Sequence, residues 1–163
     1  MRIRQANAAD VPALMNLERE TAFAAHWPQQ QYEHLFQTAD GRLSERYVWL
    51  VEKGQSTQAR EIFEAQHRVL GFLIARRMNE EWELENIVVS SAVRRQGLGK
   101  LLVTELIARA RQTSASHICL EVRESNQNAR GLYEKLGFET AGLRKNYYSS
   151  PQENAVLYRL DLC

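Results

Sequence analysis

The chain has 163 residues and a formal net charge of +1, with 44% hydrophobic and 25% charged residues. This length predicts a single domain, residues 1–163, that is large enough to bury a hydrophobic core. Because a charge this close to zero gives no overall basic field, we expect neither a nucleic acid nor a membrane as a partner.

Cysteine and histidine are too sparse for a disulfide framework or a metal site. The two cysteines are Cys119 and Cys163, and the four histidines are scattered along the chain without the spacing of metal ligands. We therefore expect no metal. The N-terminus has no apolar core of a signal peptide, and no apolar run approaches the ~20 residues of a membrane span, which predicts a cytoplasmic protein.

The first half of the chain predicts two strands, two helices and a long loop. A strand at residues 3–6 precedes a helix that has Asp10 as its N-cap, and Pro28 opens a second helix that Gly41 ends. The β-branched and aromatic run at 47–51 predicts a strand. Residues 53–68 are polar and predict an exposed hairpin loop, with a helical turn around 60–65.

The second half alternates between the periods of strands and helices. Strands are predicted at 69–75, 83–89, 117–123, 138–143 and 155–162, and helices at 97–112 and 126–136. Gly137 follows the second helix in the position that favours glycine. In the strand at 117–123, alternate residues form an apolar face and a face carrying His117, Cys119, Glu121 and Arg123. The whole order predicts a mixed α/β domain.

A glycine loop joins the strand at 83–89 to the helix at 97–112. The loop reads Arg-x-x-Gly-x-Gly from Arg94 to Gly99, and Arg95 and Lys100 add positive charge. Free backbone N–H groups at a helix N-terminus bind anions, and glycine lets a phosphate approach the backbone closely. Two other phosphate-binding motifs are excluded. A Walker loop would need glycine in place of Arg94, and a Rossmann fingerprint would need glycine in place of Leu102.

This loop resembles that of the GCN5-related N-acetyltransferase (GNAT) family. The resemblance implies an α/β fold with a central, mostly antiparallel sheet, flanking helices and a splayed pair of central strands. It also implies acetyl-CoA as the co-substrate, with the pyrophosphate on the loop and the pantetheine arm on the preceding strand. The implied coenzyme-binding residues are Ile87, Val88, Val89, Arg94, Arg95, Gln96, Gly97, Leu98, Gly99 and Lys100, together with Asn126.

A second pattern narrows the resemblance to one branch of that family. Residues 120–138 are similar to the motif LEVRxSNxxAxxLYxKLGF, and residues 144–157 to RxNYYxxxxEDAIxM. These motifs are typical of the bacterial ribosomal-protein-alanine N-acetyltransferase (RimI-type) branch. The similarity is close in the second half of the chain and holds in outline in the first. The polar segment 53–68 is a departure, because that branch usually has a tight hairpin there.

Acetyl transfer to an amine requires a base for the amine and a proton for the departing thiolate. The branch implies Glu121 as the general base and Tyr133 as the general acid, and it places Asn126 near the pantetheine. Alternatives remain for each. Glu85 rivals Glu121, Tyr133 also fits an ordinary core position, and Asn126 or Ser125 fits a helix N-cap.

The pKa of the acceptor amine narrows the choice of acceptor. Deprotonating an α-amine at pH 7 costs about 1.4 kcal/mol, and deprotonating a lysine side chain costs about 4.6 kcal/mol. A single carboxylate can therefore act as base for an α-amine more easily than for a lysine. With the branch resemblance, this favours a protein N-terminus, an alanine of a ribosomal protein, with Tyr147 and Tyr148 as a peptide clamp or simply packed on the sheet. The alternatives are a small amine or lysine acceptor, and a non-catalytic acyl-CoA-binding module.

Overall fold

The computed structural model describes residues 1–37, 45–54 and 69–162. Within these residues, seven strands hydrogen-bond into a sheet of order β1-β2-β3-β4-β5-β7-β6, accompanied by four α-helices. The strands are β1 Arg2–Gln5, β2 Arg46–Glu52, β3 Val69–Met78, β4 Glu81–Val89, β5 His117–Arg123, β6 Glu139–Ser149 and β7 Gln152–Asp161. The helices are α1 Val11–Arg19, α2 Gln29–Glu33, α3 Leu98–Gln112 and α4 Gln127–Lys135. The predicted mixed α/β fold class is confirmed.

The strand pairs are mostly antiparallel. β1 runs antiparallel to β2, and β7 runs antiparallel to both β5 and β6. β4 and β5 are parallel, with a register that joins Glu81–Leu84 to His117–Leu120. Since both strands continue beyond these residues, they pair over only part of their length, as expected for the central pair.

The chain packs as two compact units. The first contains Met1–Ile74 and Asn86–Leu102, and the second contains Ala75–Glu85 and Val103–Cys163. Strands β3 and β4 therefore contribute to both units. The sequence prediction of one domain stays a prediction.

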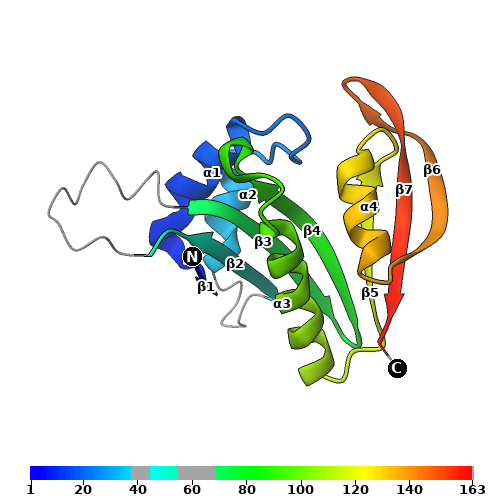
Figure 1. Ribbon diagram of the computed structural model, residues 1–163, viewed down its shortest axis with the longest axis horizontal. Coiled ribbons are helices and arrows are strands. Elements are labelled where there is room, and N and C mark those ends of the chain that lie inside the picture. The colour runs from blue at the N-terminus through cyan, green and yellow to red at the C-terminus, as the bar shows by residue number, and fades with distance from the viewer. Residues whose placement is uncertain (38–44, 55–68, 163) are drawn as a thin grey trace, which may run out of the picture. The chain divides into compact units, whose positions relative to one another are not determined.

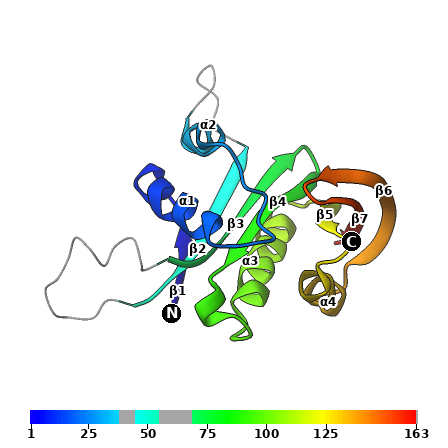
Figure 2. The same ribbon diagram turned by 90° about the horizontal axis from the view of Figure 1, so that it is seen from above.

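In the first unit, α1 and α2 cover one face of β2 and β3 (Figures 1 and 2). Leu14 and Leu17 of α1 and Tyr32 of α2 are buried against Leu50 and Phe72 of the strands. The ring of Tyr32 meets the ring of Phe72 edge-on, with centroids 6.4 Å apart. Each Å² of apolar surface buried contributes about 25 cal/mol of stabilisation, and this burial holds such short helices on the sheet.

Helix α1 begins at its predicted N-cap residue, Asp10, but without the side-chain hydrogen bond of a cap. The Asp10 carboxylate instead accepts hydrogen bonds from the backbone N–H of Asn7 and from the Arg4 guanidinium, each at 2.8 Å. Asn7 caps the preceding 3-10 turn by accepting from Ala9 N–H at 2.9 Å. The ion pair with Arg4 competes for the carboxylate that capping would have used.

Gly71 in β3 lies against the backbone of β4. A Cβ added at Gly71 would stand 2.9 Å from the Val88 carbonyl oxygen, which is too close for two non-bonded atoms. We expect Gly71→Ala to lower the free energy of unfolding by about 1–3 kcal/mol, because backbone must move to admit the methyl group. Urea denaturation measures this, with Gly131→Ala as a control because its Cβ would meet nothing within 4 Å.

In the second unit, β5, β6 and β7 form an antiparallel group beside α4 (Figure 1). Tyr133 of α4 is buried against Phe138 and Tyr158, with ring centroids 5.7 and 6.1 Å away. The indole of the buried Trp82 donates a hydrogen bond to Thr113 Oγ1 at 3.1 Å. Gly137 follows α4 at φ +90°, the left-handed conformation expected of a glycine after a helix.

The last two strands are longer than predicted. The sequence predicts residues 138–143 and 155–162, whereas β6 reaches Ser149 and β7 begins at Gln152. Most residues of β6 are exposed, so the strand lacks the apolar alternation that sequence analysis requires. Pairing with β7 supplies its hydrogen bonds instead. The predicted loop at 53–68 falls, from residue 55 on, outside the described residues, as does the break at Gly41.

Candidate active site

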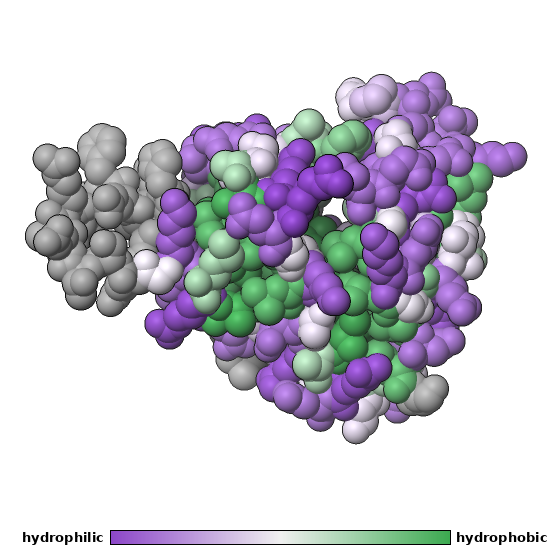
Figure 3. Space-filling model, in the orientation of Figure 1, coloured by the Kyte–Doolittle hydropathy of each residue, from purple (hydrophilic) through white to green (hydrophobic). Residues whose placement is uncertain are grey.

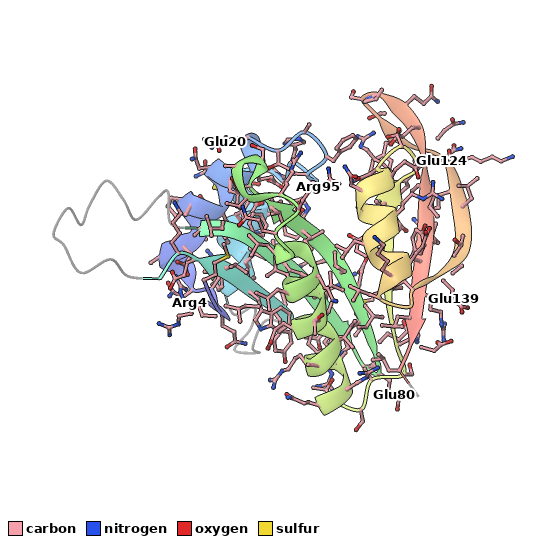
Figure 4. The ribbon with its side chains drawn as sticks, in the orientation of Figure 1. Arg4, Glu20, Glu80, Arg95, Glu124 and Glu139 are labelled. Carbon is pink, nitrogen blue, oxygen red and sulfur yellow. The ribbon has the colours of Figure 1, made fainter. Side chains whose placement is uncertain are left out.

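In the first unit, the loop between β4 and α3 is shaped to present backbone N–H groups. Arg95 has φ +63° and Gly97 has φ +82°, and α3 starts directly afterwards at Leu98. The first helical hydrogen bond recorded there runs from Leu101 N–H to the Gly97 carbonyl at 2.9 Å. The N–H groups of the first turn are therefore available to an anion. Figure 4 shows the exposed Arg95 on this loop.

The end of β4 that leads into this loop lies beyond the part of the strand that pairs with β5. In the described residues, the register with β5 ends at Leu84, before the stretch 87–89. Upstream, the buried Asn86 donates to Glu18 of α1 at 2.7 Å, and Glu18 also accepts from the Trp27 N–H at 3.1 Å. Sequence analysis missed Glu18, whose place on the buried face of an amphipathic helix was the available signal.

In the second unit, Glu121 lies beside two residues of β6. The Arg144 Nε donates to the Glu121 carboxylate at 3.0 Å, and the Arg144 guanidinium lies 5.4 Å from the centre of the Tyr147 ring. The Glu121 charge, followed by partial burial, raises the pKa of the half-exposed Tyr147 phenol. The structure thus brings Glu121 and the Arg144–Tyr148 segment together.

Glu85, the rival of Glu121, shares a partner in the same unit with Glu83 of the same strand. Arg76 of β3 approaches Glu83 at 2.7 Å and Glu85 at 3.7 Å. Sequence analysis did not single out Arg76, although it stands where the apolar run of β3 turns polar. Burial raises the pKa of the nearby Cys119 thiol, and the charges of Glu83 and Glu81 raise it further. This polar face of β4 and β5 therefore carries several carboxylates.

Tyr133 is buried in α4. Burial, and then the charge of Tyr148, hold its pKa above that of an ordinary tyrosine, so the phenol stays protonated at neutral pH. Tyr133 packs in the core, as the alternative of an ordinary core position predicted. A role in proton donation is compatible with that packing. His117 is also buried rather than exposed on the polar face, beside Glu81 at 3.3 Å.

Asn126 caps α4. Its side-chain oxygen accepts from the Ala129 N–H at 3.2 Å, while Ser125 donates instead to Glu153 at 3.0 Å. The choice left open by the sequence is therefore decided for Asn126. Since its side-chain NH₂ is a separate donor, capping leaves it able to contact a ligand.

Tyr148 is held differently from Tyr147. It is half-buried, with the Arg123 guanidinium 4.1 Å above its ring and the Tyr147 ring edge-on at 5.1 Å. Arg123 in turn lies 3.6 Å from Glu153. Of the two tyrosines, Tyr147 is the one exposed for contact with another molecule.

The sequence matches the acetyltransferase (GNAT) family over residues 11–138. The chain belongs to this family. It is 34% identical over 160 residues to the [ribosomal protein bS18]-alanine N-acetyltransferase of Haemophilus influenzae, covering 95% of this chain and 94% of that one. The family and enzyme class predicted from sequence, an N-acetyltransferase, are thereby confirmed.

Solved GNAT structures share the fold. The ribosomal-protein-S18-alanine N-acetyltransferase of Escherichia coli superposes with a TM-score of 0.77 at 27% identity, covering 99% of this chain and 93% of that one. Arabidopsis thaliana NAA60 in complex with acetyl-CoA gives a TM-score of 0.79 at 14% identity, covering 99% and 98%. That second likeness bears on the fold alone.

The predictions about location, metal and partners concern features that the described residues address only in part. Within the part of the chain that the structure describes, no helix is both long and apolar enough to cross a membrane, and no group of three or more potential ligands is placed to hold a metal. A cytoplasmic location, and the absence of metal, nucleic acid and membrane partners, stay predictions.

Proposed function

We propose that this GNAT enzyme transfers the acetyl group of acetyl-CoA to the α-amine of a protein N-terminus, the N-terminal alanine of ribosomal protein bS18. The observation that carries the proposal is the 34% identity, over nearly the full length of both chains, to an enzyme named for that reaction. The glycine loop and the motif at residues 120–138 support the proposal, because the first can bind the coenzyme and the second supplies a base and an acid.

The loop of the first unit is the part we assign to the coenzyme. The N–H groups from Arg95 to Lys100 hold the pyrophosphate at the start of α3, where the helix dipole favours negative charge. The backbone of residues 87–89 pairs with the pantetheine arm. The left-handed backbone at Gly97 fits this assignment, because it turns the chain directly into the helix.

The carboxylate of Glu121 is the group we assign as general base. It takes the proton as the amine nitrogen attacks the thioester carbonyl, and the new C–N bond forms as the C–S bond breaks. The thiolate that leaves takes a proton from Tyr133. The exposure of the neighbouring Tyr147 supports this assignment, since an acceptor must reach the base from solvent.

The identity of the acceptor is tested by mass spectrometry. The protein is incubated with acetyl-CoA and a peptide carrying the N-terminal sequence of bS18, and the fragments locate the acetyl group. We expect one acetyl on the α-amine of alanine and none on a matched peptide with a blocked N-terminus. Transfer to a diamine or a lysine side chain in preference to the peptide would favour the alternative acceptors. Coenzyme binding without any transfer would favour a non-catalytic module.

Replacing Arg95 tests the coenzyme assignment. We expect Arg95→Ala to raise the KM for acetyl-CoA about fivefold to tenfold while kcat stays near wild type, because the guanidinium contributes to binding the phosphates but not to the chemistry. Initial rates at varied acetyl-CoA measure both. Arg111→Ala, at an exposed arginine of α3, is the matched control. An unchanged KM would mean that the backbone N–H groups hold the phosphates without Arg95.

A further inference from the structure

Strand β6 carries a bulge in the segment next to Glu121. From Arg144 to Tyr148, β6 advances four residues while its partner β7 advances two, from Ala155 to Glu153. Asn146, inside the bulge, has φ +54°. A bulge bends its strand and changes the direction of its side chains, so its shape decides where residues on either side of it point.

The side chain of Asn154 on β7 holds this bulge from two directions. Its Oδ1 accepts from the Asn146 N–H at 3.0 Å, which satisfies a backbone donor inside the bulge. Its Nδ2 donates to the Glu124 carboxylate at 2.9 Å. The Asn154 carbonyl also accepts from the Glu124 N–H at 3.1 Å. One carboxamide therefore ties the bulge to the segment that links β5 to α4, where Figure 4 shows Glu124.

Arg144 at one end of the bulge and Tyr147 inside the bulge lie beside the proposed base. Arg144 pairs with the Glu121 carboxylate at 3.0 Å, and Tyr147 lies half-exposed within the reach of its charge. The tip of the β6–β7 hairpin is mainly hydrophilic on the face that Figure 3 shows. The rings of Tyr147 and Tyr148 pack on each other, and Arg123 packs on Tyr148. The Asn154 carboxamide adds two hydrogen bonds, one of them to the backbone inside the bulge.

The amide at position 154 is a requirement of the pair that it forms with Glu124. With aspartate at 154, two carboxylates would face each other at the 2.9 Å now bridged by a hydrogen bond. Like charges at that distance repel, so Glu124 and an amide at 154 belong together.

We propose that Asn154 is a positioning residue, which fixes the β6 bulge and thereby holds Arg144 and Tyr147 beside Glu121 in the arrangement that receives the acceptor amine. This inference rests on the proposed function, because it assigns the bulge to the acceptor. Because Asn154 is not assigned to the coenzyme, we expect its replacement to change the KM for the acceptor and not the KM for acetyl-CoA.

The test compares four proteins of nearly equal size. Asn154→Asp keeps an oxygen for the Asn146 N–H but places a carboxylate opposite Glu124. Glu124→Gln keeps an oxygen that accepts from Asn154, so it is expected to behave as wild type. In the double variant, the new glutamine amide donates to the new aspartate, which restores the bridge. Asn79→Asp, in the exposed turn between β3 and β4, is the control for the same change elsewhere.

Two readouts are measured. For Asn154→Asp we expect the KM for the acceptor peptide to rise roughly tenfold with the KM for acetyl-CoA unchanged, and the Asn146 amide to exchange its hydrogen roughly fivefold faster by NMR. We expect the double variant to recover both values. Unchanged exchange and acceptor KM, an equal rise in both KM values, or no recovery in the double variant would each overturn the proposal.

Failure of the proposed function would look different. If the wild-type protein does not acetylate the peptide, the assignment of the acceptor fails. Hydrogen exchange still decides whether Asn154 fixes the bulge, because that measurement needs no substrate. Exchange in Asn154→Asp that matches wild type would overturn the positioning role whatever the acceptor is.

Discussion

Glu121→Gln is expected to lower kcat by about 10²–10⁴, with the KM for acetyl-CoA unchanged. Glutamine has the shape of glutamate and keeps an oxygen for the Arg144 Nε, which now donates at 3.0 Å. The substitution therefore removes the base while leaving the local contacts in place. Steady-state rates with the acceptor peptide measure the loss.

The pH dependence of this loss identifies the role of Glu121. Without a base, the reaction uses only amine that is already deprotonated, and an α-amine of pKa near 8 is only about 3% free at pH 6.5. The deficit of Glu121→Gln should therefore be greatest at low pH and shrink as the pH approaches 8. A variant that kept full activity at pH 6.5 would show that Glu121 is not the base.

Two further variants make the comparison decisive. Glu85→Gln removes the rival carboxylate, which lies 3.7 Å from Arg76. If it loses more activity than Glu121→Gln, the base is Glu85. Glu139→Gln, at an exposed position at the start of β6 (Figure 4), is the matched control and should keep wild-type rates.

Tyr133→Phe is expected to lower kcat by about 10²–10³, with binding of acetyl-CoA nearly unchanged. Phenylalanine keeps the ring that packs on Phe138 and Tyr158, so only the hydroxyl is lost. The pKa of Tyr133 is raised, which makes proton transfer to a thiolate uphill by more than the ~2 kcal/mol between ordinary phenols and thiols. We expect the hydroxyl to stabilise the departing sulfur by hydrogen bonding before the proton moves.

The raised pKa has a consequence for the pH profile. Because Tyr133 loses its proton only above the ordinary range of tyrosine, wild-type kcat should show no decline below pH 10 that depends on this residue. Rates from pH 7 to 10, with thermal melting as a check of the fold, test this expectation. A Tyr133→Phe variant with wild-type kcat would assign Tyr133 to the core alone.

The sequence by itself determined the family and those regular elements that have a local apolar pattern. The strand at 117–123 and the helix that starts after Gly97 follow from strict alternation and from helical spacing of apolar residues, which are local signals. The glycine loop could be predicted from the sequence because an anion site at a helix N-terminus is built from residues that follow one another in the chain. Glu121, Tyr133 and Asn126 were named from the resemblance to the motif of one branch of the family, and their roles stay predictions.

The tertiary structure alone decided which residues are partners. Arg144 and Glu121 are 23 residues apart in the chain, and no local period relates them, yet pairing of β7 with both β5 and β6 brings them within 3.0 Å. The same pairing extends β6 through an exposed segment without an apolar pattern and creates its bulge. Hydrogen bonds between distant strands fix these features, and the energy of such bonds depends on register and geometry that sequence composition does not encode.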